Sequence, residues 1–186
     1  MARIPPFKEA DRPDLADAVA RIRRGRSGAL LNVYRLLLHS PPLAQTWFDH
    51  NGAVRFQTTL EGRLREIVII RIAHLNAIPY VLRQHVPALA AAEGVTEAEC
   101  AALGERTTDW LGSGGPFDAR ERAALAMADA MTLGTHVPDH VFAAVREHYD
   151  DRGIVELAVL VGTYLMHNRV MNALGIDLEP DENRGR

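Results

Sequence analysis

The sequence predicts an all-α protein of about eight helices. Apolar residues recur at helical spacing in several segments of ten residues or more. Polar capping residues precede several of these segments, and glycine or proline follows them, as is typical of helix ends. The segments show no convincing alternation of apolar and polar residues, so strands are not expected.

The first half of the chain begins with an arm that is rich in proline and charge, residues 1–12. Asp14 then opens a helical pattern that Gly25 ends. The next helices are expected over residues 29–39, 42–50, 60–76 and 80–93, with breaks at Pro41-Pro42, at Asn51-Gly52 and near Pro79.

The second half contains clearer helix-start signals. Thr96 and Glu99 form a capping-box pattern, which predicts a helix from there to about Trp110. After a glycine-rich loop, further helices are expected over residues 119–133, 139–149 and 152–174, and glycines end the first and the last of them.

The segment 60–76 is apolar almost all round the predicted helix, which indicates deep burial. Its run Ile67-Val68-Ile69-Ile70 could also form a buried strand. The length of the segment and the lack of a second strand candidate favour a helix.

A chain of 186 residues is long enough for one domain with a full core. We expect an N-terminal arm and helix over residues 1–24, a helical domain over residues 25–178 and a disordered tail over residues 179–186. The net charge of -3 provides no electrostatic reason to expect a nucleic acid or an anionic membrane as partner.

The chain is expected to be cytoplasmic and not to span a membrane. No stretch reaches eighteen uninterrupted apolar residues, and the N-terminus lacks the apolar core of a signal peptide. The single cysteine, Cys100, cannot form an internal disulfide, which fits a reducing compartment.

Glu66 and His85 are the candidate catalytic residues. Glu66 stands in an apolar stretch, where an unpaired carboxylate would be costly to bury, and His85 lies nineteen residues later on the next predicted helix. If the two helices fold back on each other, these groups form a proton-transfer pair, and apolar surroundings would raise the pKa of the carboxyl group. Alternatively, Glu66 stabilises a helix start or pairs with a neighbouring arginine, and His85 is a packed structural histidine.

Three neighbouring residues are candidates for substrate binding. Arg83 lies two residues before His85 and could bind a substrate carboxylate with two hydrogen bonds, although it could also be a solvated surface arginine. Tyr80 lies five residues before His85, and His74 lies eight residues after Glu66, near the same helix face. His74 could therefore line the same pocket or be a packed histidine.

A metal site is the rival chemistry for the histidines. His136 and His140 are four residues apart, but Pro138 between them spoils regular helical geometry, and no His-Glu-x-x-His pattern is present. No glycine-rich phosphate loop occurs either. We therefore expect no metal and no cofactor.

With these residues in place, the chain resembles the carboxymuconolactone decarboxylase family, which includes the alkyl hydroperoxidase D-like proteins. The resemblance rests on residues 64–67, 84–87 and 91–99 and covers about residues 25–178. It implies an alkyl hydroperoxidase D-like helical bundle. It also implies a homo-oligomer, trimeric or hexameric, with the pocket near a subunit interface.

The hydroperoxidase branch of the family carries two cysteines between its glutamate and its histidine, at the positions of Ile78 and Val81 here. Without that thiol pair, peroxide reduction through a disulfide should be absent. The chain is similar to the decarboxylase branch, with Glu66, Arg83 and His85 at the matching positions. This similarity implies cofactor-independent decarboxylation of a small carboxylated lactone or related aromatic-catabolism intermediate.

Two other functions stay open at this point. The chain could be a non-catalytic family member in which the glutamate and the histidine form a structural pair. A weaker alternative is residual peroxidase activity through Cys100.

Overall fold

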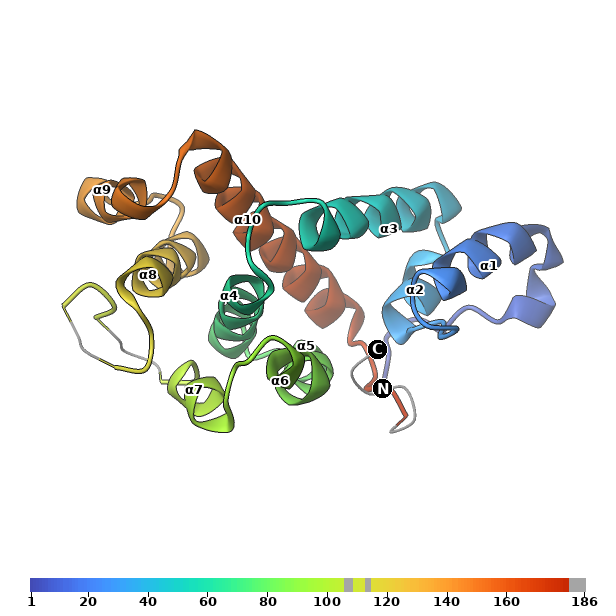
Figure 1. Ribbon diagram of the computed structural model, residues 1–186. Coiled ribbons are helices and arrows are strands. Elements are labelled where there is room, and N and C mark those ends of the chain that lie inside the picture. Colours follow the sequence, from blue (N-terminus) through green and yellow to red (C-terminus); the bar gives the residue numbers. More distant parts are fainter. Residues whose placement is uncertain (106–108, 113–114, 181–186) are drawn as a thin grey trace.

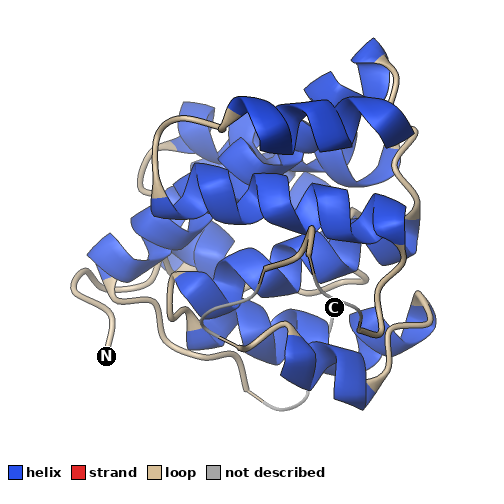
Figure 2. Cartoon of the chain, turned by 90° about the vertical axis from the view of Figure 1, so that its left-hand side faces the viewer, coloured by secondary structure: helices blue, strands red, loops and turns tan. Residues whose placement is uncertain are grey.

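The structure is a computed structural model that describes residues 1–105, 109–112 and 115–180 of the chain. Every regular element of the described residues is helical, which confirms the predicted all-α class (Figures 1 and 2). The α-helices are α1 (Ala16–Arg24), α2 (Asn32–Leu37), α3 (Pro41–Phe56), α4 (Gly62–Leu75), α5 (Pro79–Gln84), α6 (Ala90–Ala92), α7 (Glu97–Ala102), α8 (Ala119–Leu133), α9 (Asp139–His148) and α10 (Asp151–Leu174). Two short 3-10 turns, η1 (Glu9–Asp11) and η2 (Pro13–Leu15), precede α1, and a π-helical segment, η3 (His85–Leu89), joins α5 to α6.

Helix α4 lies at the centre of the main core, in contact with α5, α8 and the long α10 (Figure 1). Nine of its fourteen residues are buried, which matches the deep burial expected from its sequence. The run Ile67–Ile70 is fully buried within this helix, so the alternative that it forms a strand is wrong.

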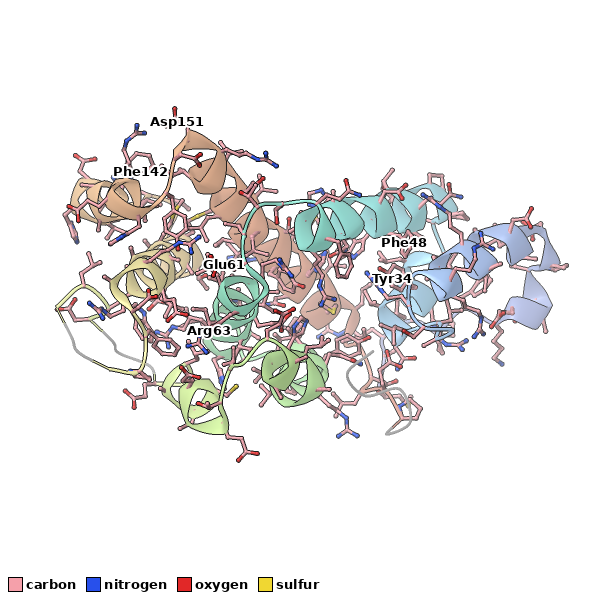
Figure 3. The ribbon with its side chains drawn as sticks, in the orientation of Figure 1. Tyr34, Phe48, Glu61, Arg63, Phe142 and Asp151 are labelled. Atoms are coloured by element: carbon pink, nitrogen blue, oxygen red, sulfur yellow. The ribbon has the colours of Figure 1, made fainter. Side chains whose placement is uncertain are left out.

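A second, smaller core forms where α1, α2 and α3 meet. Its centre is the edge-to-face pair of Tyr34 and Phe48, whose ring centroids are 5.9 Å apart (Figure 3). Phe7 of the N-terminal arm is buried in the same cluster. The arm is therefore held against the body of the protein rather than lying loosely on its surface.

The expected helix starts are largely confirmed. Capping boxes are present at Thr96 with Glu99 and at Asp118 with Glu121. Gly175 ends α10 in the left-handed conformation, with φ 61°, which a residue without a Cβ adopts at no steric cost.

Three predicted boundaries are wrong. Helix α3 continues past Asn51-Gly52 to Phe56, because the Asn51 side chain bonds within the helix and to α10 instead of forming a turn. The helices predicted over residues 29–39 and 96–110 are shorter, spanning α2 and α7 respectively.

The helix predicted over residues 80–93 is present, but its middle is a π-helical segment that begins at His85. Pro87 has no N–H, so the regular hydrogen-bond ladder cannot continue through it, and the Ala90 N–H reaches back five residues to the His85 carbonyl. Such π segments occur frequently at functional sites.

The first residue of the predicted tail is packed against the helices. Glu179 is only 3% exposed and accepts hydrogen bonds from the Tyr80 hydroxyl and the Asn32 backbone N–H, so it belongs to the packed structure. The remainder of the predicted tail, from residue 181 on, lies outside the described residues. None of the described helices combines the length and the apolar content needed to cross a membrane.

A buried arginine ties α4 to α8. Arg71 is 1% exposed and donates two hydrogen bonds of 2.7 Å to Asp129, as well as bonds to the carbonyls of Leu103 and Glu105. Its guanidinium group also lies 5.1 Å from the Trp110 ring centroid. The cost of burying this cation is offset because its donors are paired.

We predict that Asp129→Ala lowers the free energy of unfolding by about 3–5 kcal/mol, because it leaves the Arg71 charge buried without its carboxylate. Urea denaturation measures this change. The control Asp139→Ala, at an exposed position in the first turn of α9, should cost less than about 1 kcal/mol. Equal losses in the two variants would contradict the proposed role of the pair.

Candidate functional site

Glu66 and His85 meet inside the protein. The His85 Nδ1 lies 2.6 Å from the Glu66 Oε2, and the two residues are 6% and 3% exposed. Glu66 comes from the centre of α4 and His85 from the first position of η3, so the two helices fold back on each other as the sequence hypothesis requires. The bond orients the imidazole and leaves its Nε2 without a hydrogen bond to any described residue.

The pKa of Glu66 departs from the sequence expectation. Burial acts to raise this pKa. The charge and hydrogen bond of the adjacent His85, together with the charges of Arg55 and Arg65, outweigh burial, so the pKa is lowered below 4.5. The expectation of a raised value is therefore wrong, because it considered the apolar surroundings without the cations. Glu66 is an ionised carboxylate at neutral pH.

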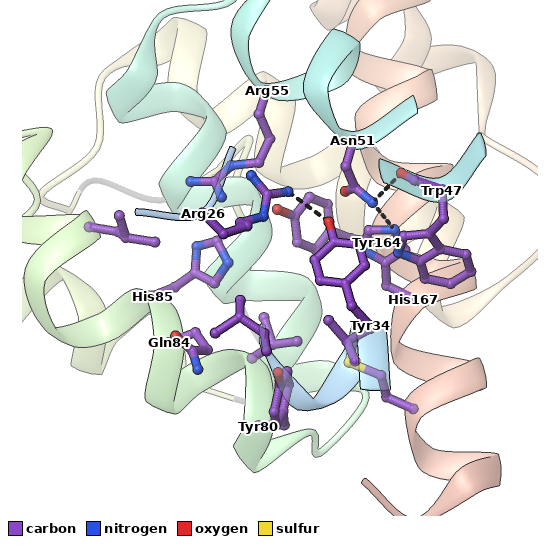
Figure 4. A pocket seen from close by; sticks show the side chains of 15 residues that line it. Arg26, Tyr34, Trp47, Asn51, Arg55, Tyr80, Gln84, His85, Tyr164 and His167 are labelled. Carbon is purple, nitrogen blue, oxygen red and sulfur yellow. Dashed lines mark hydrogen bonds between the residues drawn. The ribbon is translucent and has the colours of Figure 1, made fainter. Parts of the chain in front are cut away.

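The other face of His85 borders a cavity between α2, α3, α5 and α10 (Figure 4). The volume of the cavity is about 80 Å³, which is smaller than the pockets that enclose drug-sized ligands. A substrate would therefore have to extend into the open mouth of the cavity. Five side-chain rings besides that of His85 contribute to its wall. The rings that line it are those of Tyr34, Trp47, Tyr80, Tyr164 and His167.

Two arginines contribute positive charge to this cavity, next to His85 (Figure 4). Arg26 donates a 2.9 Å hydrogen bond to the Tyr34 hydroxyl, and the Arg55 Nη2 lies 3.6 Å from the Glu66 Oε1. Sequence reasoning missed both. Arg26 lies in the short Gly25–Gly28 connection, and Arg55 lies beyond the predicted end of its helix.

Two aromatic rings of α10 complete the wall. The Tyr164 ring packs edge-to-face on His85, with centroids 5.8 Å apart, and burial raises the pKa of Tyr164 to about 12. His167 stacks on Trp47 at 4.4 Å. Both were missed by sequence reasoning, although polar rings three residues apart in an apolar helix were an available signal.

Of the three candidates for substrate binding, only Tyr80 lines the same cavity as His85. Its hydroxyl group donates to Glu179 at 2.6 Å, and burial, followed by the charge of Glu179, raises the pKa of Tyr80. Tyr80 thus enters the cavity as a neutral ring whose hydroxyl proton is already engaged.

Arg83 and His74 lie elsewhere. Both line a second hollow between α5 and α7, together with Cys100, so the structure does not bring them to His85. Arg83 lies about 200° around the helix from His85, given about 100° for each residue. For Cys100, burial, followed by the charges of nearby glutamates, raises the pKa of the thiol, which makes it a poor nucleophile.

The positions that hold cysteines in the hydroperoxidase branch are filled by apolar side chains. Ile78 is 1% exposed and Val81 is 4% exposed, and Val81 lines the cavity beside His85. The site described here therefore has an acid, two histidines, two cations and aromatic rings, with no sulfur at those two positions.

Comparison with solved structures supports the fold. An uncharacterized peroxidase-related protein with an alkylhydroperoxidase AhpD core, from Ralstonia eutropha JMP134, superimposes with a TM-score of 0.78 at 22% identity, covering 98% of this chain and 94% of that chain. A protein of unknown function from Agrobacterium tumefaciens has a TM-score of 0.69 at 23% identity, covering 78% and 97%. The debrominase Bmp8 in complex with 2,3,4-tribromopyrrole has a TM-score of 0.74 at 20% identity, covering 96% and 94%. The predicted alkyl hydroperoxidase D-like fold is confirmed.

Comparison of sequences relates part of the chain to a known family. The uncharacterized protein YdfG of Bacillus subtilis (strain 168) is 28% identical over 122 residues, which cover 64% of this chain and 78% of YdfG. Residues 41–130, which include both Glu66 and His85, match the carboxymuconolactone decarboxylase family. The chain thus carries a segment of the carboxymuconolactone decarboxylase family on an alkyl hydroperoxidase D-like fold.

Proposed function

We propose that the protein is a cofactor-independent carboxy-lyase that removes CO₂ from a small carboxylated lactone or a related intermediate of aromatic catabolism. The observation that carries the proposal is the orientation of His85, whose Nδ1 is held by Glu66 at 2.6 Å while its ring borders an aromatic cavity with two arginines. The match of residues 41–130 to the carboxymuconolactone decarboxylase family supports this class of reaction and substrate.

The chemistry follows from the positions of these groups. Arg26 and Arg55 attract the anionic substrate into the cavity. When the bond to the carboxylate breaks, CO₂ leaves and the electron pair passes into an enolate on the adjacent carbonyl oxygen. His85 then delivers a proton from its Nε2 to the carbon, and the imidazole regains a proton from solvent.

Glu66 is a positioning residue in this scheme. Its carboxylate accepts the Nδ1–H of His85, which fixes the direction of the ring and stabilises the doubly protonated imidazolium that carries the transferable proton on Nε2. The net reaction consumes one proton and releases one CO₂, so no oxidant, reductant or cofactor is needed. We also propose a cytoplasmic homo-oligomer of three or six subunits, an assignment that rests on the family resemblance.

The non-catalytic alternative draws on the same contact. A buried acid and imidazole at 2.6 Å would also fix the packing of α4 against η3 without any turnover. The peroxidase alternative is disfavoured, because Cys100 has a raised pKa and lies in the other hollow.

We predict that His85→Ala lowers kcat on carboxymuconolactone by about 10²–10⁴-fold, because the proton donor is lost. Release of CO₂ and loss of the substrate absorbance measure turnover. The control His148→Ala, at an exposed position at the end of α9, should keep its rate. Turnover by wild type that survives in His85→Ala would refute the assignment, and no turnover by wild type would favour the non-catalytic alternative.

We predict that Arg55→Met raises KM for carboxymuconolactone about tenfold or more, because a charged hydrogen bond to the substrate is lost. Arg83→Met, which changes the arginine of the second hollow, should leave KM within about twofold. Steady-state kinetics separate the two variants. If Arg83→Met has the larger effect, the substrate binds in the second hollow and the site is assigned wrongly.

The Glu66 carboxylate should also contribute to stability in a pH-dependent way. Its pKa is lowered in the folded protein, so its contribution is present above 4.5 and is lost as the pH falls through the folded value. We predict that Glu66→Gln unfolds at lower urea concentration than wild type at neutral pH, and that the difference shrinks as the pH falls below 4.5. A difference that does not change with pH would show that Glu66 is not ionised in the folded protein.

A further inference from the structure

The hydrogen bonds of Asn51 determine the tautomer of His167. The Asn51 Nδ2 lies 2.9 Å from the Trp47 carbonyl oxygen and 3.0 Å from the His167 Nε2 (Figure 4). A backbone carbonyl can only accept, so the atom between them is the amide nitrogen and donates to both. The His167 Nε2 must therefore accept, which places the proton of the ring on Nδ1.

The surroundings of His167 keep this ring uncharged. A second proton, on Nε2, would point at the amide protons of Asn51, and the facing groups include the cations Arg26 and Arg55 and the imidazoles His50 and His85. Burial, followed by these charges, lowers the pKa of His167 to about 3. The Tyr164 hydroxyl, with its raised pKa, provides no negative charge to offset them.

The Nδ1–H of His167 is available to the cavity. His167 lines the same cavity as His85, and none of the described residues accepts a hydrogen bond from its Nδ1. The ring is held between the Trp47 face, at 4.4 Å and 15°, and the Tyr164 ring, at 5.2 Å. Figure 4 shows Tyr164 between the two imidazoles, with the arginines on the His85 side.

We propose that His167 is a second, neutral hydrogen-bond donor of this site, and that its Nδ1–H binds the substrate carbonyl oxygen on which negative charge develops as CO₂ leaves. The proposal rests on the proposed function, and it narrows the substrate to acids in which the carbon that bears the departing carboxylate is attached to a ketone or lactone carbonyl, either directly or through a carbon–carbon double bond.

A neutral donor suits this role for a physical reason. Its hydrogen bond to an uncharged carbonyl is weak and strengthens as the oxygen becomes an enolate, so the interaction favours the transition state over the bound substrate. A charged imidazolium would instead attract every carboxylate of the substrate from the start. The division is then clear: Arg26 and Arg55 attract the acid, His85 moves the proton and His167 stabilises the oxygen.

The tautomer is tested directly by long-range ¹H–¹⁵N NMR of the imidazole rings, without any need for turnover. We expect the His167 signals of a ring protonated at Nδ1 only, unchanged between about pH 5 and pH 8. A ring protonated at Nε2, or one that titrates in this range, would overturn the proposal. His167→Gln assigns the signals.

Ligand contact is tested with carboxymuconolactone added to His85→Ala, in which turnover is blocked. The Nδ1–H signal of His167 should shift on binding, and a signal that does not move at saturation would overturn the proposal. This result is independent of the proposed reaction. If the signal shifts but the wild-type protein shows no turnover, His167 is still a hydrogen-bond donor to the ligand, and the proposed decarboxylase activity is refuted.

Kinetics test the transition-state role. His167→Leu should lower kcat by about 10²–10³-fold, as expected for one lost donor to a developing oxyanion, with KM changed by less than about threefold. His167→Asn, whose amide nitrogen can stand near the Nδ1 position, should recover part of that loss. The control His148→Gln, at an exposed position at the end of α9, should keep its rate. Circular dichroism confirms folding, and a folded His167→Leu with unchanged kcat, or with a change in KM alone, would overturn the proposal.

Discussion

The burial of the Glu66 carboxylate in the middle of α4 is the constraint on which the site depends. An ionised carboxylate placed in an apolar core costs several kcal/mol unless it is paired and hydrogen-bonded. His85 at 2.6 Å and Arg55 at 3.6 Å supply that pairing, from η3 and α3 respectively. The acid therefore ties three separate helical segments together, and the same contact that makes its burial tolerable also orients the imidazole at the cavity wall.

The fold could be predicted from the sequence because it follows from local patterns. Each of these patterns involves residues that are close together in the sequence. They are the capping boxes, the glycines at helix ends and the helix at residues 62–75, which is apolar all round. The meeting of Glu66 and His85 was predictable for a different reason, since a buried acid requires a partner. The direction of its pKa shift was not predicted, because burial is outweighed by the charge and hydrogen bond of His85 together with the charges of Arg55 and Arg65, and that balance depends on distances that the sequence does not contain.

The remainder of the site could not be predicted from the sequence, because it depends on tertiary contacts that override local propensity. Asn51-Gly52 is a strong turn signal, yet Asn51 bonds to Trp47 and His167, and α3 continues through it. That continuation is what carries Arg55 to the cavity. Proximity in sequence suggested Arg83 instead, but a residue two positions from His85 on a helix faces away from it, and the structure places it in another hollow.

The two histidines of the cavity show how one side chain can serve opposite purposes. His85 faces a carboxylate and can hold and release a proton, whereas His167 faces an amide donor and cations and is kept neutral. With Ile78 and Val81 in place of the thiols of the hydroperoxidase branch, the chemistry that we propose for this cavity is proton transfer and oxyanion binding. Those two proposed tasks would require one charged and one neutral imidazole, and the packing of α3 and α10 against the π segment provides a separate environment for each ring.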